Sequence, residues 1–431
     1  MQINEAQKLF EGFCKPGICL GLERVRALMR ALGNPQKRCK YVHIAGTNGK
    51  GSTCAMTEYA LRKSGYKTGM YVSPALSVFN ERIRINGKYI DDKFIEKYLP
   101  MVISASRKIQ SEGFEAPSVF EAVTALAFLI FAENKCDIVV LEVGMGGRLD
   151  ATNVITSPEV CAITSIALDH TEYLGDTREK VAGEKAEIIK KGADAVIYDN
   201  GESINKIFCE KCKQVGAFCH ICDFNEISDI SLNRDGSRFN YKGNSYRLSL
   251  LGKYQIFNAV IAVEILNCLK KRGFNIESDS IISSLNEVAW QGRLTKLNSA
   301  PLVLLDGAHN PDGARALAES LASILGNEKA YMLCGMLADK DVKSSLSYML
   351  PYCKKMFCTT PPVYRAMSDN ELSSMAKEIG FDAVCGGEPC SALRIAYSKA
   401  KEDNTPLVIF GSLYMSGQIS ARFEKIKNEE K

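Results

Sequence analysis

The chain has 431 residues and a mass of 47.4 kDa, roughly two to three times the usual length of one domain. Hydrophobic residues make up 46% and charged residues 24%, and a mean hydropathy of −0.09 excludes extensive disorder and fibrous repeats. The 54 lysines and arginines against 50 acidic residues leave a net charge of +4, which gives no reason to expect a nucleic acid partner. We therefore expect at least two folded domains that bind small anions at local sites.

The amino-terminal and apolar segments give no sign of export or membrane insertion. Residues 1–5 lack the basic and apolar regions of a signal peptide. The longest apolar stretch, residues 122–132, is far shorter than the ~20 residues that a bilayer requires, and it predicts a buried helix. We expect a cytoplasmic protein whose 16 cysteines are mostly small buried side chains, because disulfides rarely persist in a reducing compartment.

In the first half of the chain, short β-branched runs alternate with longer helical patterns, as in βαβ units that build a mainly parallel sheet. A strand over 41–45 leads through a glycine-rich loop into a helix over 50–64. Further strands are expected over 68–72, 138–143 and 160–166. Their carboxyl ends are polar or glycine-rich, and ligands bind at such ends in open α/β sheets.

The pattern restarts at residue 301 with a second, smaller α/β unit. Its expected elements are strands over 302–305, 330–334, 355–358 and 407–410 and helices over 312–325 and 342–350. We predict an α/β protein with an N-terminal phosphate-loop domain over 1–295 and a C-terminal Rossmann-like domain over 301–431. The segment 290–300 is the expected hinge.

The segment 43–53, HIAGTNGKGST, lies between the first strand and the first helix and predicts a phosphate-binding loop. Glycines let backbone N–H groups close around phosphate oxygens, and the helix N-terminus adds a positive dipole end. Lys50 supplies a positive charge, and the hydroxyl of Ser52 or Thr53 can reach a Mg²⁺ ion. The segment differs from the strict G-x-x-x-x-G-K-[ST] pattern, since Gly51 separates Lys50 from Ser52. A glycine-rich turn without a ligand is the alternative, which the flanking strand and helix disfavour.

Several acidic residues and histidines stand in or at the ends of predicted strands. Glu142 closes an apolar strand before a glycine-rich turn, and a carboxylate there suits Mg²⁺, which prefers oxygen ligands. His170 ends another strand, where a histidine satisfied within a loop would fit equally well. Asp306 and His309 follow the first strand of the second domain, where a strand-to-helix turn would present them outward. His43 lies inside a strand and is predicted to be structural.

Four cysteines form the pattern Cys209-x-x-Cys212 and Cys219-x-x-Cys222, a pairing typical of zinc or iron–sulfur sites. The first pair falls in a predicted helix and shares a face. The second pair falls in a predicted strand, where an offset of three residues places the two side chains on opposite sides. Four ligands would converge only with an irregular turn, so we expect free thiols, with a bound metal as the alternative.

Together these motifs resemble those of the folylpolyglutamate synthase and dihydrofolate synthase family, within the wider group of ATP-dependent Mur ligases. The resemblance covers nearly the whole chain in the same order, which makes it far more specific than the phosphate loop alone. The segments that carry it are 46–52, Ser73-Pro74, 80–83, Phe120-Glu121 with Thr124, 142–153, Asp169-His170, 183–186, 255–259, 292–294, 306–310 and 410–414.

The resemblance implies an amide ligase. ATP would phosphorylate a folate carboxylate, and the amine of L-glutamate would attack the resulting acyl phosphate, which carries a better leaving group than the carboxylate. By family likeness, the ATP phosphates would be held by Gly49, Lys50, Gly51 and Ser52. One or two Mg²⁺ ions would be held by Ser73, Glu142 and His170.

Three further residues match those that contact ATP in the family, namely Asn258, Arg293 and Asp306. Because the first two are assigned to the first domain and Asp306 to the second, closure of the two domains is expected to assemble the site. The resemblance also places His309 near the nucleotide or the transferring phosphate.

Lys185 matches a family lysine that CO₂ converts to a carbamate, an anion able to support a second metal ion. Without the resemblance, a surface lysine in a helical segment would be the simpler interpretation. Phe120, Glu121, Thr124 and Asp150 fall where family members line the pterin and folate pocket, although Phe120 also suits an apolar core.

The segment 148–153 resembles enzymes that also make dihydrofolate from dihydropteroate more than strictly polyglutamylating ones. We therefore expect folate or dihydropteroate and L-glutamate as substrates, no nucleic acid or membrane partner, and a monomer. Two other functions stay open. A phosphate-loop kinase or ATPase with a regulatory second domain would explain 46–52 and Glu142 but not 306–310, and a zinc-dependent binding module would rest on the four cysteines.

Overall fold

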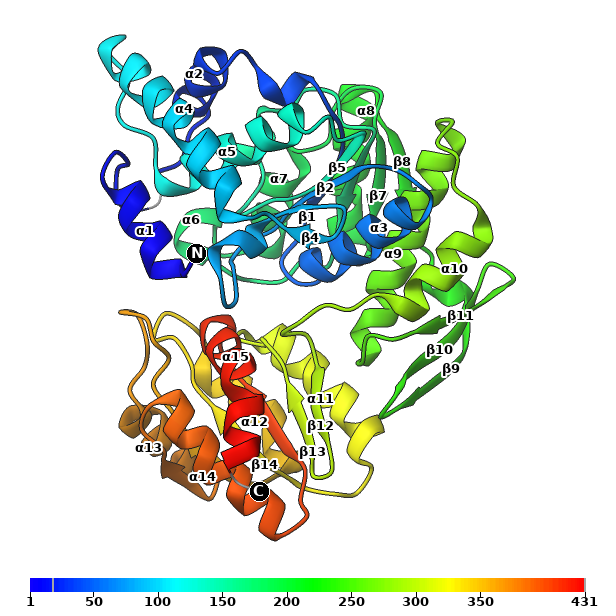
Figure 1. The fold of residues 1–431 in the computed structure, drawn as a ribbon. Helices are drawn as coiled ribbons and strands as arrows, with labels where there is room; N and C mark the ends of the chain where they lie inside the picture. Colours follow the sequence, from blue (N-terminus) through cyan, green and yellow to red (C-terminus); the bar gives the residue numbers. More distant parts are fainter. Residues whose placement is uncertain (18, 430–431) are drawn as a thin grey trace. The chain divides into compact units, whose positions relative to one another are not determined.

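In the computed structural model, which describes residues 1–17 and 19–429, the chain divides into two compact units. The first comprises Met1–Glu226 and Phe257–Leu285, and the second comprises Ile227–Ile256 and Asn286–Lys431. Both units are α/β, which confirms the predicted fold class (Figure 1). The predicted domains, 1–295 and 301–431, differ from these units mainly in residues 227–256, which belong to the second unit.

The first unit is built around an eight-stranded sheet in the order β4-β3-β2-β5-β1-β6-β7-β8. The parallel strands are β1 (Lys40–Ala45), β2 (Thr68–Tyr71), β5 (Ile138–Glu142), β6 (Val160–Ile163), β7 (Asp194–Ile197) and β8 (Phe218–Ile221). The antiparallel hairpin β3 (Ile83–Ile85) and β4 (Lys88–Tyr89) completes one edge. Since β2, β5 and β6 run parallel to β1, the loops that follow these four strands leave the sheet at the same edge.

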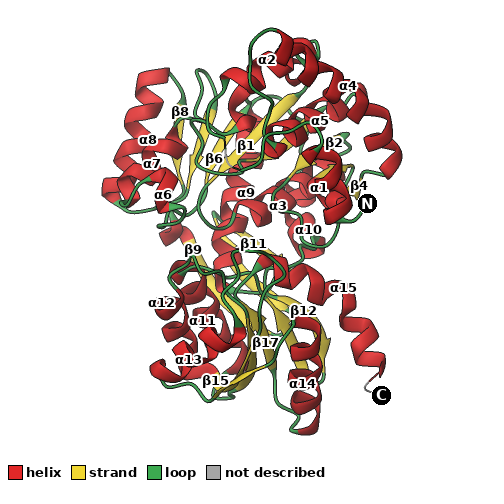
Figure 2. Ribbon diagram, turned by 90° about the vertical axis from the view of Figure 1, so that its left-hand side faces the viewer, coloured by secondary structure: helices red, strands yellow, loops and turns green. Residues whose placement is uncertain are grey.

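Helices cover both faces of this sheet (Figure 2). On one face a single apolar cluster joins α2 (Glu23–Ala31), α4 (Asp92–Ser111) and α5 (Val119–Glu133) to Tyr41, Tyr71 and Leu141. A second cluster on the same face joins α7 (Arg178–Ala186) and α8 (Glu202–Val215) to β6 and β7. The remaining helices are α1 (Ile3–Glu11), α3 (Lys50–Lys63), α6 (Thr171–Leu174), α9 (Lys253–Lys271) and α10 (Ser278–Glu287).

The apolar stretch 122–132 forms the buried middle of α5, as predicted. The helix begins at a capping box in which Ser118 Oγ accepts a hydrogen bond from Glu121 N at 3.2 Å and Glu121 Oε2 accepts one from Ser118 N at 2.7 Å. Arg24 Nε lies 3.2 Å from the same Oε2. No helix of the described ranges is both long and apolar enough to pass through a bilayer.

The second unit contains a six-stranded sheet in the order β12-β13-β17-β14-β15-β16, with β12 as its antiparallel strand. Its strands are β12 (Thr295–Ser299), β13 (Leu302–Leu305), β14 (Ala330–Cys334), β15 (Cys353–Cys358), β16 (Ala383–Cys385) and β17 (Leu407–Phe410). One face packs on α11 (Pro311–Leu325), α12 (Val342–Met349) and α13 (Asp369–Ile379), and the other on α14 (Pro389–Glu402) and α15 (Leu413–Glu429). The second half of the segment predicted as a hinge is thus strand β12 of this sheet.

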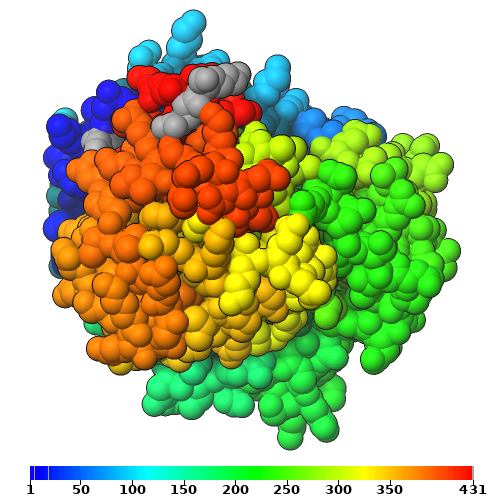
Figure 3. All heavy atoms as spheres, turned by 90° about the horizontal axis from the view of Figure 1, so that it is seen from below, coloured from blue at the N-terminus to red at the C-terminus, as the bar shows by residue number. Residues whose placement is uncertain are grey.

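A small antiparallel sheet of β9 (Ile227–Asn233), β10 (Gly236–Tyr241) and β11 (Asn244–Leu248) completes the second unit. Arg234 NH2 lies 2.7 Å from Glu328 Oε2, just beyond α11, and Lys296 Nζ lies 2.7 Å from Asp235 Oδ1. Figure 3 shows the atoms of this sheet, in green, beside those of α11, in yellow. These contacts explain why residues 227–256 group with the second unit.

We predict that Ser118→Ala lowers the free energy of unfolding of the first unit by about 1 kcal/mol, because the first turn of α5 loses its capping oxygen. Urea unfolding followed by circular dichroism measures the change. The matched control is Ser111→Ala at the exposed end of α4, which caps no helix start and should change stability by less than about 0.5 kcal/mol. Equal shifts in the two variants would contradict the prediction.

Candidate active site

The phosphate loop lies between β1 and α3, as the sequence predicts. Gly49 precedes the first residue of α3 with a φ of 90°, a left-handed conformation that favours glycine. Ser52 is buried in the first turn, where backbone N–H groups point out of the helix start. Such a start is suited to binding phosphate.

The loop is tied to the residues after β6. Thr47 N donates to Ser165 O at 2.8 Å, and Thr164 Oγ1 donates to Asn48 O at 2.7 Å. A Cβ on Gly46 would lie 1.8 Å from Thr164 Oγ1, so only glycine fits there. Lys50 Nζ donates to Gly46 O at 3.1 Å and to Thr47 O at 3.2 Å, which holds its positive charge over the loop.

Ser73 and Glu142 are brought together after β2 and at the end of β5. Ser73 N donates to Glu142 Oε2 at 3.2 Å, and the carboxylate is buried with an exposed fraction of 5%. His170, the third predicted metal ligand, is exposed at the start of α6 with a φ of 51°. Ser73 and Glu142 therefore lie side by side, while the imidazole of His170 comes from a separate loop.

Lys185 is buried in α7, with an exposed fraction of 4%, although its side chain carries an amine. Burial, and then the nearby positive charge of Lys50, lowers the pKa of Lys185 from 10.5 to about 7. The residue is therefore not the surface lysine that its local sequence suggests. Close to neutral pH, a large fraction of its amine is uncharged and nucleophilic.

Two of the four predicted folate-pocket residues, Phe120 and Asp150, lie beside Gly144, two residues after β5. A Cβ on Gly144 would lie 2.4 Å from Phe120 Cζ and 3.1 Å from Asp150 Oδ2. Asp150 Oδ2 accepts from Met145 N at 2.9 Å, while burial raises the pKa of this carboxyl group. Thr124 Oγ1 lies 3.1 Å from the hydroxyl of Tyr71, whose ring packs against Phe120 with the ring centres 6.2 Å apart.

Glu121 is the fourth predicted pocket residue, and it contacts the start of α5 and Arg24. Two pocket neighbours were not singled out from the sequence. Tyr71 is hidden within an ordinary strand pattern, and Arg82 lies in the loop 80–83 that carries part of the family resemblance. Arg82 interacts with the Tyr71 hydroxyl, and within the described residues its buried Nε has no hydrogen-bond partner.

Asp306 organises a cluster in the second unit. Its Oδ2 accepts from Tyr254 Oη and from Leu294 N, both at 2.7 Å, and its Oδ1 accepts from Ala308 N at 2.7 Å. Arg293 belongs to this second unit, whereas the predicted boundary assigns it to the first domain, 1–295. A Cβ on Gly307 would lie 2.5 Å from Arg293 NH1, so the guanidinium group lies directly beside the turn.

The other two predicted nucleotide residues have different settings. Asn258, which is buried in α9, lies in the first unit, where a Cβ on Gly49 would lie 2.3 Å from its Oδ1. It therefore reaches the phosphate loop. His309 Nδ1 lies 2.8 Å from Gly307 O in the turn before α11.

Comparison with known proteins gives matches over most of the chain. Residues 44–266 match the family model of the Mur ligase middle domain, and residues 293–422 match that of the dihydrofolate synthetase C-terminal domain. A dihydrofolate synthase/folylpolyglutamate synthase of Bacillus subtilis is 33% identical over 98% of this chain and 99% of its own length. A folylpolyglutamate synthase of Lacticaseibacillus casei is 32% identical over 92% of each chain.

Solved structures give the same result. The structure of Mycobacterium tuberculosis folylpolyglutamate synthase complexed with ADP and AMPPCP is 31% identical, covers 98% of each chain and superposes with a TM-score of 0.88. The structure of E. coli FolC in complex with DHPP and ADP is 27% identical, covers 100% of this chain and 99% of that chain, and superposes with a TM-score of 0.85.

We predict that Gly144→Ala destabilises the first unit by about 1–3 kcal/mol, because the added methyl group displaces Phe120 and crowds Asp150. Thermal unfolding followed by circular dichroism measures the loss. Gly12→Ala is the matched control, since Gly12 has a φ of −64° and its nearest contact would be at 3.8 Å. A Gly144→Ala variant that unfolds at the wild-type temperature would refute the crowded geometry.

Proposed function

Because the chain belongs to the dihydrofolate synthase/folylpolyglutamate synthase family, we propose that it is an ATP-dependent ligase that joins L-glutamate to a folate carboxylate. The observation that carries the proposal is a phosphate loop beside a buried strand-end carboxylate, Glu142, within a chain that resembles ADP-bound synthases over its full length. The kinase or ATPase alternative is disfavoured, since the second unit also matches a synthetase domain.

The phosphates of ATP would bind at the start of α3. Backbone N–H groups from Gly49 to Ser52 would donate to the phosphate oxygens, and Lys50 would turn from its carbonyl partners to the phosphates. Asn258 beside Gly49 and the Asp306–Arg293 cluster are the proposed nucleotide contacts outside the loop. We propose that His309, in the turn after Asp306, acts near the transferring phosphate.

The residues at the ends of β2 and β5 fit Mg²⁺. A buried carboxylate and a hydroxyl lie side by side in Glu142 and Ser73, and Mg²⁺ prefers oxygen ligands. His170 is the proposed third ligand. When bound, the metal would neutralise charge on the phosphates during transfer.

The reaction proceeds in two steps. A carboxylate oxygen of the folate attacks the γ-phosphorus of ATP, the bond to the bridging oxygen breaks and ADP leaves. The amine of L-glutamate then attacks the acyl carbon, the carbon–oxygen bond to phosphate breaks, and the amine loses a proton as the amide forms. Both steps bring anions together, and the positive charge of Lys50, with that of a bound metal ion, would offset their repulsion.

The acceptor would lie along Phe120, Thr124 and Asp150. Phe120 offers a ring face to a flat heterocycle, while Asp150 and Thr124 offer polar atoms next to it. Several relatives carry both synthase names, which supports dihydropteroate as a second acceptor beside folate. The cytoplasmic location and the monomeric state stay predictions.

We propose that Lys185 becomes a carbamate. An uncharged amine attacks CO₂ and releases a proton, and a lysine with a pKa of about 7 has about half its amine uncharged at pH 7. For an ordinary lysine with a pKa of 10.5, fewer than about one amine group in a thousand is uncharged at pH 7. The buried cation becomes an anion, which would support a second Mg²⁺ ion.

The first test of the function is ADP release by purified protein in the presence of Mg²⁺. We expect turnover only when L-glutamate and either tetrahydrofolate or dihydropteroate are both present, because the acyl phosphate forms on the acceptor and is consumed by the amine. Comparing the two acceptors separates the two synthase activities. Sustained ADP release with neither substrate would contradict a ligase and favour an ATPase.

The second test concerns the carbamate. We expect Lys185→Ala to lower the rate of ADP release by about 10–100-fold, as the loss of a group that supports a metal ion does. Added short carboxylic acids should restore part of this rate. The matched control is Lys180→Ala on the same helix, an exposed lysine paired with Asp176, which should keep wild-type activity. A fully active Lys185→Ala enzyme would rule out the carbamate.

A further inference from the structure

Three cysteine sulfurs gather between α8 and the edge strand β8, away from the proposed active site. Cys209 and Cys212 lie three residues apart on α8, and Cys219 is the second residue of β8. The Sγ atoms of Cys209 and Cys219 are 3.4 Å apart, and Cys212 also interacts with Cys219. The fourth cysteine of the motif, Cys222, is buried just beyond β8. The motif is therefore a thiol cluster centred on Cys219.

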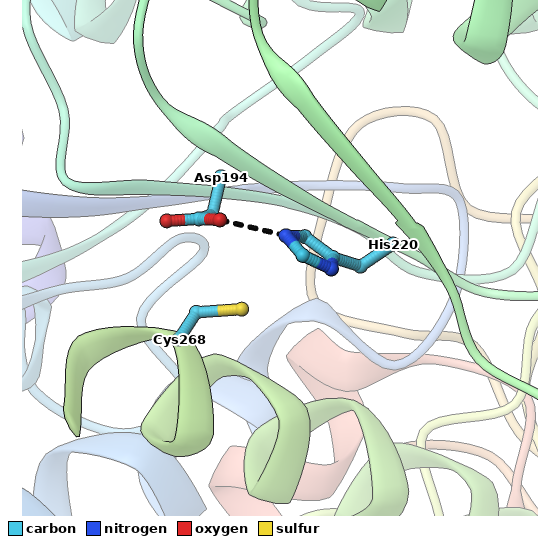
Figure 4. Close-up of side chains that lie close together, drawn as sticks. All are labelled: Asp194, His220 and Cys268. Atoms are coloured by element: carbon cyan, nitrogen blue, oxygen red, sulfur yellow. Dashed lines mark hydrogen bonds and ion pairs between the residues drawn. The ribbon is translucent and has the colours of Figure 1, made fainter. Parts of the chain in front are cut away.

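The opposite face of β8 carries a different cluster, shown in Figure 4. His220 Nε2 lies 2.6 Å from Asp194 Oδ1, and Cys268 of α9 points into the same space. Arg272 Nε donates to the second oxygen of Asp194 at 2.5 Å, so a guanidinium cation already balances this carboxylate. A metal cation there would be repelled by that positive charge, so the cluster does not suit a metal ion.

Accessibility and distance favour oxidation in the thiol cluster, whereas the hydrogen bond to Cys212, and then burial, raise the pKa of Cys219 and lower its share of reactive thiolate. Cys219 is exposed, Cys209 is half-buried and Cys212 is buried. A disulfide has a sulfur–sulfur length of about 2.05 Å, so the 3.4 Å pair must approach by about 1.4 Å, a movement within reach of side-chain rotation. The other exposed cysteine among the described residues, Cys385, has Asn370 Oδ1 and Asp369 O as its sulfur contacts, and the cysteine opposite it in the sheet, Cys358, is buried.

We propose that Cys209 and Cys219 form a redox modification site, in which a hydroperoxide converts the two thiols into an intramolecular disulfide. The exposed sulfur of Cys219 attacks the peroxide, the O–O bond breaks, and Cys219 becomes a sulfenic acid while its proton leaves with the other oxygen. Cys209 then attacks Cys219 sulfur, the S–S bond forms, and the hydroxyl group leaves as water with the Cys209 proton. Two electrons pass from the sulfurs to the peroxide, and a thiol reductant reverses the change.

The site would fasten helix α8 to the edge of the sheet. The two cysteines are joined by a short connection that turns at Gly216, whose φ is 72°, so closure bridges neighbouring elements and needs no rearrangement of the fold. On the same helix, Lys211 Nζ lies 2.6 Å from Glu187 Oε1, the residue that ends α7. The oxidised form would therefore hold α8 both to β8 and to the helix that carries Lys185. This proposal does not depend on the proposed function.

The test treats the full-length protein with hydrogen peroxide and maps its peptides by mass spectrometry without reduction. We expect a Cys209–Cys219 cross-linked peptide, the loss of a pair of titratable thiols, and their return with dithiothreitol. Cys219→Ser should abolish the cross-link, and Cys385→Ser, the matched exposed cysteine, should leave it intact. Circular dichroism of both variants checks that they fold.

Three results would overturn the proposal. One is Cys219 driven to sulfinic or sulfonic acid while Cys209 stays a free thiol. Another is a disulfide formed only between Cys212 and Cys219. The third is stoichiometric zinc in the untreated protein that is lost in Cys219→Ser and protects the thiols from peroxide, which would make the cluster a metal site instead.

Discussion

The arrangement of the candidate site in the first unit depends on the close approach of the phosphate loop to the residues after β6. Thr164 fills the space where any side chain at Gly46 would lie, and its hydroxyl donates to Asn48 O. This contact fixes the carbonyl groups that hold Lys50, and Lys50 in turn contributes to the low pKa of Lys185. The absence of a side chain at Gly46 thus allows the loop conformation that positions the charge of Lys50 near Lys185.

Three buried acids of the candidate site share one feature: their oxygens accept hydrogen bonds from backbone N–H groups near strand ends. Glu142 accepts from Ser73 N, Asp150 from Met145 N, and Asp306 from Leu294 N and Ala308 N. These donors offset part of the cost of burying a carboxylate, which is otherwise several kcal/mol. They also fix the direction of each carboxylate, as a site that binds metal and phosphate requires.

The sequence predicts the large sheets well, because an apolar run such as 138–143 can only be a strand buried on both faces. It also places Glu142 and Asp306 correctly, since polar residues after such strands must stand at the sheet edge. It does not predict β12 or the sheet β9–β11, whose residues are largely exposed and lack a strong apolar pattern. Nor does it predict the pairing of Cys209 with Cys219 or of Tyr71 with Thr124, which depends on how distant segments come together.

The interleaved order of the two units along the chain has a consequence for synthesis. The first unit requires residues 257–285, so it is complete only after 227–256, a piece of the second unit, has already been made. Two contacts of that piece can form only once Asn286–Lys431 is being made. Arg234 pairs with Glu328, and Tyr254 donates to Asp306. Domains generally fold as units from the amino terminus during translation. Here the first unit must fold around residues 227–256, which contain the three-stranded sheet β9–β11 and whose contacts with Asp306 and Glu328 can form only after those later residues have been made.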